Sequence, residues 1–283
     1  MITFAPSLHN RIDNRTEMDE YGLYMQRHLR AVQLKELAIL KEIHKVCVQH
    51  QIEYWLDGGT ILGALRHSGF IPWDDDIDIA MRKEDVPRFL EAAKKDLPSW
   101  LYVQTPETDV SRLPMIKIRD NNSFLVEPND DFFQSYPKGL YVDIFPFEPY
   151  PSVSRKFCKR ILKGYCTANG VMNAKHYYSL RSFVEFFWFG GKRLWSRLAW
   201  MLACAICPRH EFMGNSIDSN GYGIMHKRVD IFPVSTIQFE GETFMAPARP
   251  HDYASNIYGD YMKLPPEDQR TGHAVFYSES LKD

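Results

Sequence analysis

A cluster of four aspartates runs directly into an apolar segment in the sequence Asp74-Asp-Asp-Ile-Asp-Ile-Ala-Met81. From Asp76 onward, acidic and apolar residues alternate with period two, which is the pattern of a half-buried strand. Asp76 and Asp78 therefore share one face of that strand. Carboxylates this close repel one another unless a cation offsets their charge, so we expect a metal site rather than a solvated strand edge.

The residues before this cluster predict a turn suited to phosphate. Glu53-Tyr-Trp-Leu56 is a short β-prone run, and the two glycines of Asp57-Gly-Gly-Thr60 then allow a tight turn into a helix. Backbone N–H groups at such a turn can approach phosphate oxygens, while carboxylates on a neighbouring strand can hold Mg²⁺ through oxygen ligands. We expect Gly58, Gly59 and Thr60 to contact a phosphate of the substrate.

Periodicity predicts an α/β arrangement for the first 150 residues. Apolar residues at three- and four-residue steps predict an amphipathic helix over 31–50, and further helices are expected over 61–66 and 85–95. Strands are expected over 115–119 and 140–145. Ile237 to Phe244 is typical of a hairpin that turns at Glu240 and Gly241. The expected fold class is α/β or α+β, with a mixed sheet flanked by helices.

Further residues could complete a phosphate-transfer site. A third carboxylate is normally needed for a metal pair, and Asp143 is the best candidate because it sits in the apolar strand Tyr141-Val-Asp-Ile-Phe145. Asp74 and Asp75 could bind the metal directly, but they better suit groups that support the metal ligands, turn formers or plain surface charge. Arg66 and His67 could pair with phosphate oxygens, or could only complement the dipole at the end of a helix.

The stretch from Tyr54 to Asp78, which includes Asp57-Gly-Gly-Thr-Ile-Leu-Gly-Ala-Leu-Arg66 and Ile71-Pro-Trp-Asp-Asp-Asp76, closely resembles the LicD family. This family includes bacterial phosphocholine transferases and the fukutin-related glycan-modifying proteins. The resemblance covers most of residues 31 to 150 and the end of the chain. Further matching motifs are Lys117-Ile-Arg-Asp120, Val142-Asp-Ile-Phe-Pro146, Tyr258-Gly-Asp-Tyr261, Leu264-Pro-Pro266 and Arg270 to His273.

The resemblance implies a nucleotidyltransferase-like fold and a specific chemistry. Family members transfer a phosphoalcohol, such as phosphocholine or a phosphopolyol, from a CDP-linked donor to a sugar hydroxyl of a cell-surface glycan or its precursor, such as lipopolysaccharide or teichoic acid. Asp76, Asp78 and Asp143 would hold the metal, which we expect to be two Mg²⁺ or Mn²⁺ ions. Asp143 is also our first candidate for the general base.

The matching cations have two interpretations each. Lys117 and Arg119 would neutralise the donor phosphates, or they could form a cross-strand ion pair. Arg270 and His273 would lie near the site, or could serve only to pack the C-terminal segment. Two rival functions remain open: a nucleotidyltransferase of the same fold that releases pyrophosphate, and an inactive module that binds glycan or membrane.

Residues 152 to 220 depart from the resemblance, and we interpret them as a helical insertion within a single domain, residues 1–283. Residues 152–209 hold eleven Lys or Arg and one acid, Glu185, which gives a local net charge of +10. The same segment carries many Phe and Trp residues. This combination predicts peripheral contact with an anionic membrane, although a helical core with a solvated basic face or an acceptor-binding face would also explain it.

Composition limits the classes of function. A net charge of −2 argues against whole-protein binding to nucleic acid. Five cysteines and the absence of a signal-peptide pattern over Met1 to Asn10 predict a cytoplasmic protein, free or peripheral on the inner face of the membrane. Cys204-x-x-Cys207-x-x-His210, with Cys158 or Cys166, has zinc-like spacing, but buried small hydrophobes are the favoured interpretation.

Overall fold

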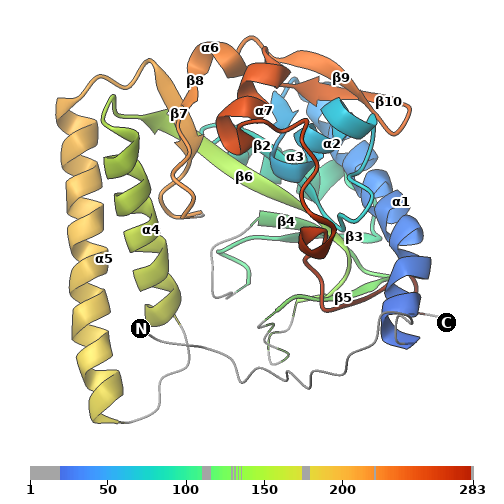
Figure 1. Ribbon diagram of the computed structural model, residues 1–283, viewed down its shortest axis with the longest axis horizontal. Helices are drawn as coiled ribbons and strands as arrows, with labels where there is room; N and C mark the ends of the chain where they lie inside the picture. Colours follow the sequence, from blue (N-terminus) through green and yellow to red (C-terminus); the bar gives the residue numbers. More distant parts are fainter. Residues whose placement is uncertain are drawn as a thin grey trace.

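A seven-stranded mixed sheet lies at the centre of the computed structural model, which describes residues 20–109, 116–128, 130, 132, 134, 136–173, 179–219 and 221–281 (Figure 1). Its main path runs β1-β2-β6-β4-β3, β7 pairs with β6, and β8 pairs with β7. The strands are β1 (Tyr54–Leu56), β2 (Ile77–Arg82), β3 (Leu101–Gln104), β4 (Ile116–Asp120), β6 (Tyr141–Tyr150), β7 (Phe212–Asn215) and β8 (His226–Lys227). The expected α+β class, with a mixed sheet flanked by helices, is confirmed.

The pairing of β2 with β6 is parallel, whereas the other pairs in this sheet are antiparallel. A parallel pair needs a crossover connection, and α3 (Val86–Asp96), β3 and β4 lie between these two strands in the chain. β2 is buried over Ile79, Ala80 and Met81 because the sheet is covered by other elements there. The parallel register places the beginnings of β2 and β6 side by side.

Two helices cover this sheet from the side opposite α4 (Arg155–Met172) and α5 (Leu180–Ile206) in the view of Figure 1. α1 (Glu20–Gln49) contacts β2, β4 and β6, and it also packs against α3. Its buried face is apolar apart from Gln33 and Glu36. α2 (Gly58–His67) packs against β2 and against α7 (Pro250–Tyr258), which brings the C-terminal part of the chain close to the start of β2.

α4 and α5 are two long helices that stand beside the sheet (Figure 1). α4 (Arg155–Met172) packs against α5 (Leu180–Ile206) and contributes to a small separate core around Tyr150 and Trp200. None of the helices that the structure describes has a stretch apolar and long enough to traverse a bilayer. The division of the chain into one domain with an insertion at 152–220 stays a prediction.

Two small sheets and several short elements complete the fold. β9 (Ser235–Phe239) and β10 (Glu242–Ala246) form the predicted hairpin, in which Glu240 and Gly241 have φ angles of 54° and 78°. Both turn residues are left-handed, as a two-residue hairpin with the favoured twist requires. β11 (Phe276–Ser278) pairs with β5 (Phe124–Val126). The remaining elements are α6 (Arg228–Ile231) and a 3₁₀ turn, Glu267–Gln269.

Several predicted boundaries are corrected by the structure. α1 begins at Glu20 rather than at residue 31, α2 begins at Gly58 rather than after Thr60, and β6 continues to Tyr150. The strands β3, β5, β7, β8 and β11 were not predicted, because they are short and lack a clear alternation of apolar and polar residues. The predicted features at Met1 to Asn10, Met115 and Lys175 lie outside the described residues.

Candidate active site

Three strands bring a lysine and two carboxylates side by side. Asp78 of β2 is the register partner of Asp143 in β6, and Asp143 is in turn the partner of Lys117 in β4. Lys117 Nζ lies 3.4 Å from Asp143 Oδ1, although the contact lacks hydrogen-bond geometry and this buried oxygen has no hydrogen-bond partner. The parallel pairing of β2 with β6 thus juxtaposes two of the predicted metal ligands, although they are far apart in the sequence.

The start of α2 holds Asp78 in position. The Asp78 N–H donates to Thr60 Oγ1 at 2.8 Å, and the Asp57 N–H donates to the Asp78 carbonyl at 3.0 Å. Gly58 has a φ of +50°, and a Cβ placed there would collide with the Asp78 carboxylate. A Cβ on Gly59 would lie 2.6 Å from Asp74 Oδ2. The two glycines are therefore needed because carboxylates approach the backbone closely at this point.

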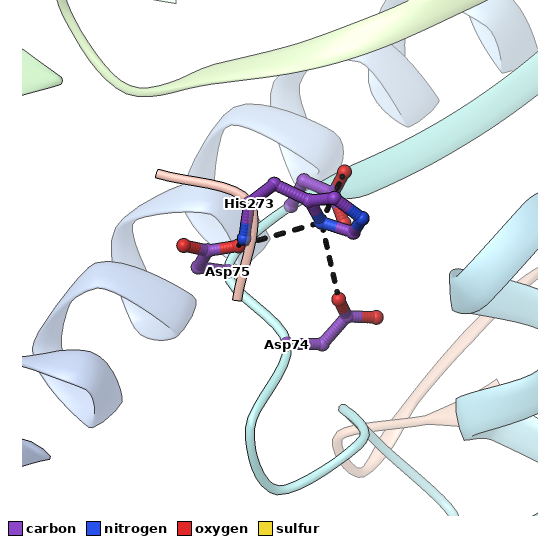
Figure 2. Close-up of side chains that lie close together, drawn as sticks. Asp74, Asp75 and His273 are labelled. Atoms are coloured by element: carbon purple, nitrogen blue, oxygen red, sulfur yellow. Dashed lines mark hydrogen bonds and ion pairs between the residues drawn. The ribbon is translucent and has the colours of Figure 1, made fainter. Parts of the chain in front are cut away.

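The second aspartate cluster lies in the loop just before β2. Figure 2 shows His273, from the C-terminal segment, reaching over Asp74 and Asp75. His273 Nδ1 lies 3.6, 3.5 and 3.3 Å from carboxylate oxygens of Asp74, Asp75 and Asp76. In the part of the chain that the structure describes, these four residues are the group whose potential ligand atoms all lie within 4.8 Å of one another. Asp78 and Asp143 lie outside this tight group, which shares only Asp76 with the predicted ligands.

Asp75 fixes the C-terminal segment rather than facing solvent. Its carboxylate accepts hydrogen bonds from the backbone N–H of His273 at 2.6 Å and of Ala274 at 2.9 Å. Asp74 and Asp75 are both buried, so the interpretation of these residues as surface charge is wrong. Asp75 instead acts as the anchor that places His273 over the cluster.

Burial and mutual repulsion disturb the ionisation of these carboxyl groups. Burial, together with Asp74, raises the pKa of Asp76 to about 7, and burial raises the pKa of Asp143 to about 6 although Lys117 opposes this. Burial raises the pKa of Asp78 well above its usual range, and Asp76 and Asp143 raise it further. The carboxylates of the two strands and of the loop therefore repel one another electrostatically, as expected for a site whose charge a cation would neutralise.

His273 carries the compensating charge. A hydrogen bond that the His273 ring donates to the Asp75 carboxylate, followed by the charge of Asp76, raises the pKa of His273 to about 9. Burial would raise the pKa of Asp75, but its hydrogen bonds with His273 outweigh burial and lower that pKa. A protonated His273 thus lies against the cluster near neutral pH, so the alternative in which it only packs the C-terminal segment is incomplete.

Sequence reasoning missed Glu36, which lies on the buried face of α1. Gln33, one turn earlier on the same face, donates from Nε2 to the Asp74 carbonyl at 2.9 Å, so this face lies under the aspartate loop. Glu36 is 1% exposed, and its Oε2 has no hydrogen-bond partner. Burial raises the pKa of Glu36 well above the usual range, and Asp76, Asp75 and Asp74 raise it further. A polar pair on an otherwise apolar helical face was the signal available in the sequence.

The cations of the Lys-x-Arg motif have protein partners. Lys117 contacts Glu127 at 3.1 Å as well as Asp143. Arg119 is 2% exposed and donates to Gln104 Oε1 at 2.6 Å and to the Gly139 carbonyl at 3.0 Å. Lys117 forms the cross-strand ion pair that was one of its two interpretations. Arg119 lies deeper, and its contact with a donor phosphate stays a prediction.

Arg66, His67 and Arg270 gather around Trp73 at the end of α2. Arg66 donates to the Tyr261 carbonyl at 2.9 Å, and its Nε donates to His67 Nε2 at 2.9 Å. The Arg270 guanidinium lies 5.2 Å from the centre of the Trp73 ring, and the His67 and Trp73 ring centres are 6.4 Å apart. Trp73 directly precedes the aspartates, so these cations flank the acidic loop.

A basic pocket of about 540 Å³ lies between α4, the loop at 221–225 and α7. Arg155, Lys159 and Lys163 line it from successive turns of α4. Tyr222 also lines it, and although 65% of Tyr222 is exposed, partial burial and the charges of Asp78 and Asp76 raise its pKa. The charges of Asp78 and Asp76 therefore act on one residue of the pocket wall.

The zinc interpretation is not supported by the geometry. The ligand atoms of Cys204, Cys207 and His210 do not come together within 4.8 Å among the described residues. Cys158 is instead buried in the small core around Tyr150 and Trp200, and Cys204 packs against that core. The five cysteines are unpaired.

Comparison with known proteins connects this site to one family. Residues 51–163 match the nucleotidyltransferase domain described as LicD/FKTN/FKRP. The chain is 27% identical over 259 residues to the lipopolysaccharide cholinephosphotransferase LicD of Haemophilus influenzae, with 87% of this chain and 96% of that protein covered. It is 32% identical over 110 residues to the human ribitol 5-phosphate transferase FKRP, with 37% of this chain and 19% of that protein covered.

Proposed function

We propose, on the premise that the chain belongs to the LicD family of phosphotransferases, that it transfers a phosphoalcohol from a CDP-linked donor to a hydroxyl of a cell-surface glycan or its precursor. Phosphocholine and a phosphopolyol are the two candidate groups, since the similar proteins are named for choline phosphate and ribitol phosphate. The proposal places the protein on the cytoplasmic side of the membrane, where CDP-linked donors are made.

One observation carries the proposal: the parallel register places Asp78 beside Asp143 under the start of α2, with Asp76 next to them. These residues fit a divalent cation, because they offer hard oxygen ligands and Asp143 Oδ1 is buried without a hydrogen-bond partner. Mg²⁺ or Mn²⁺, as two ions, would neutralise the developing charge on the donor diphosphate when bound. Asp76, Asp78 and Asp143 would hold these metal ions.

The transfer itself is a displacement at phosphorus. The acceptor hydroxyl oxygen forms a bond to the phosphorus that bears the alcohol, and the bond from that phosphorus to the bridging oxygen breaks. CMP leaves with the electron pair. The hydroxyl proton passes to a carboxylate, and Asp143 is the first candidate for this general base.

The remaining groups of the site would bind and orient the donor and the acceptor. The N–H groups of Gly58, Gly59 and Thr60 stand at the positive end of α2 and would receive phosphate oxygens of the donor. Arg66 and Arg270, at the other side of the acidic loop, would hold a second anionic part of a substrate. The pocket lined by Arg155, Lys159 and Lys163 would receive the phosphate-bearing part of the acceptor.

The nucleotidyltransferase alternative keeps the same carboxylates but transfers a nucleoside monophosphate. The experiment that tests the proposal is a turnover screen of CDP-choline, CDP-ribitol and CDP-glycerol with Mg²⁺ or Mn²⁺, with CTP as the competing donor. Faster consumption of one CDP-linked alcohol than of CTP supports the proposal. Consumption of CTP alone favours nucleotidyl transfer, and binding of glycan with no turnover of any donor favours an inactive module.

A further inference from the structure

The outer side of α5 is apolar along its whole length. The buried residues of this helix are Ser196, Trp200 and Ala203, which share the face that packs toward α4. Because a helix turns by about 100° per residue, the opposite face can be read from the sequence. It includes Phe183, Phe187, Trp188, Trp195, Leu198 and Leu202, which are between 51% and 71% exposed.

This apolar area is larger than a soluble surface usually presents. Four of the six residues are aromatic, and each aromatic side chain offers roughly 150–250 Å² of surface, so the exposed rings alone amount to something on the order of 500 Å². Contiguous apolar patches beyond a few hundred Å² usually mark an interaction site. Figure 1 shows α5 at the outer edge of the molecule, and no described element covers its outer side.

Cations flank the apolar face on both sides. Arg181 and Lys192 lie along one margin of the helix, and Arg193 and Arg197 lie along the other. The acid on this helix, Glu185, is already paired with Arg181 at 2.8 Å. An apolar face bordered by long cationic side chains is the pattern of a helix that lies in a lipid–water interface.

The charges favour a lipid surface over a second copy of the chain. Two copies joined through this face would bring the same cationic margins together, with one acid per helix to offset them. Anionic head groups would instead pair with the cations while the rings enter the acyl boundary. A spanning orientation does not fit, because Lys192 and Arg193 sit in the middle of the 27-residue helix.

We infer that the outer face of α5 docks the protein in the plane of an anionic phospholipid membrane. The helix would lie along the surface over its length of about 40 Å. If the proposed function is right, docking would bring the site to the surface that holds lipid-linked acceptors. Docking through α5 does not depend on which reaction the protein catalyses.

Vesicle flotation tests this inference directly. The full chain should float with vesicles of phosphatidylcholine and phosphatidylglycerol at low salt, float far less with phosphatidylcholine alone, and be released as salt increases. A Phe187→Ser, Trp188→Ser, Trp195→Ser variant should lose at least tenfold in bound-to-free ratio, as should a Lys192→Glu, Arg193→Glu, Arg197→Glu variant. Circular dichroism and melting curves would confirm that both variants are folded.

A matched control uses exposed apolar residues away from α5. Val229 and Met262 are 57% and 58% exposed, and Val229→Ser, Met262→Ser should float like the wild type. Failure of the wild type to bind anionic vesicles at low salt would overturn the inference. So would equal loss of binding in the control variant, or a salt-stable dimer that the α5 serine variant converts to monomer without any vesicle binding.

Discussion

Replacement of Gly58 by alanine should displace the Asp78 carboxylate and reduce the stability of the fold only slightly. Gly58 has a φ of +50°, so a side chain there costs about 1 to 2 kcal/mol in backbone strain. The new Cβ would also collide with the Asp78 carboxylate, which must turn away. Loss of one metal ligand withdraws several kcal/mol of transition-state stabilisation, and each 1.36 kcal/mol is a factor of ten in rate.

We therefore expect Gly58→Ala to lower kcat/KM by roughly 100-fold or more, while Tm decreases by only about 2 to 4 °C. Gly241→Ala is the matched control, because Gly241 has a φ of +78° and a Cβ there would meet nothing within 4 Å. It should show a similar decrease in Tm and unchanged turnover. Near-normal turnover by Gly58→Ala, or an equal loss of turnover in Gly241→Ala, would refute the reasoning.

Three further predictions concern the carboxylates. Asp76→Asn, Asp78→Asn and Asp143→Ala should each lower both turnover and Mg²⁺ affinity, measured by calorimetry, by at least tenfold in a folded protein; near-normal turnover at saturating Mg²⁺ would remove that residue from the site. The pKa of Asp76 is raised to about 7, so the folded state binds more protons than the unfolded chain between about pH 4 and 7. The stability of the metal-free protein should therefore fall as pH rises through that window. Added Mg²⁺ should raise Tm more at pH 7.5 than at pH 5.5. Melting curves with the opposite pH trend would contradict the prediction. Glu36→Gln keeps the size and shape of the side chain but prevents its ionisation, so the metal-free Tm should hold or rise while the Mg²⁺-dependent gain in Tm shrinks; an unchanged gain would show that Glu36 is not part of the site.

The acidic strand and its partner were predictable because their chemistry is local. Alternation of Asp76 and Asp78 with apolar residues predicts a strand, although β2 begins at Ile77 and Asp76 lies just before it, and the apolar residues around Asp143 predict the second strand. Their parallel pairing depends on which strands become neighbours across a long crossover, and no local pattern fixes that choice. The sequence therefore predicted two acidic strands, but not that they would become neighbours in the sheet.

Other members of the site depend on tertiary contacts that periodicity does not report. In the sequence, Glu36 is one polar position on an amphipathic helix, and only the structure shows that its Oε2 is buried without a hydrogen-bond partner. Asp75 looks like surface charge until the C-terminal segment returns and presents two backbone N–H groups to it. Arg119 has the sequence context of a phosphate-binding cation, yet its guanidinium is buried against Gln104 and Gly139. For Asp75 and Arg119, the partner comes from another segment of the chain.

The central claim is that the carboxylates beside Gly58 support transfer of a phosphoalcohol. The most direct test is ³¹P NMR of the products formed from the acceptor glycan and Mg²⁺ with either a CDP-linked alcohol or CTP as donor, with the Asp78→Asn variant as control. The proposed function predicts one CMP for each phosphodiester formed on the acceptor, and neither product with the variant. Release of pyrophosphate from CTP with a nucleotide left on the acceptor, or equal CMP release by Asp78→Asn, would contradict it.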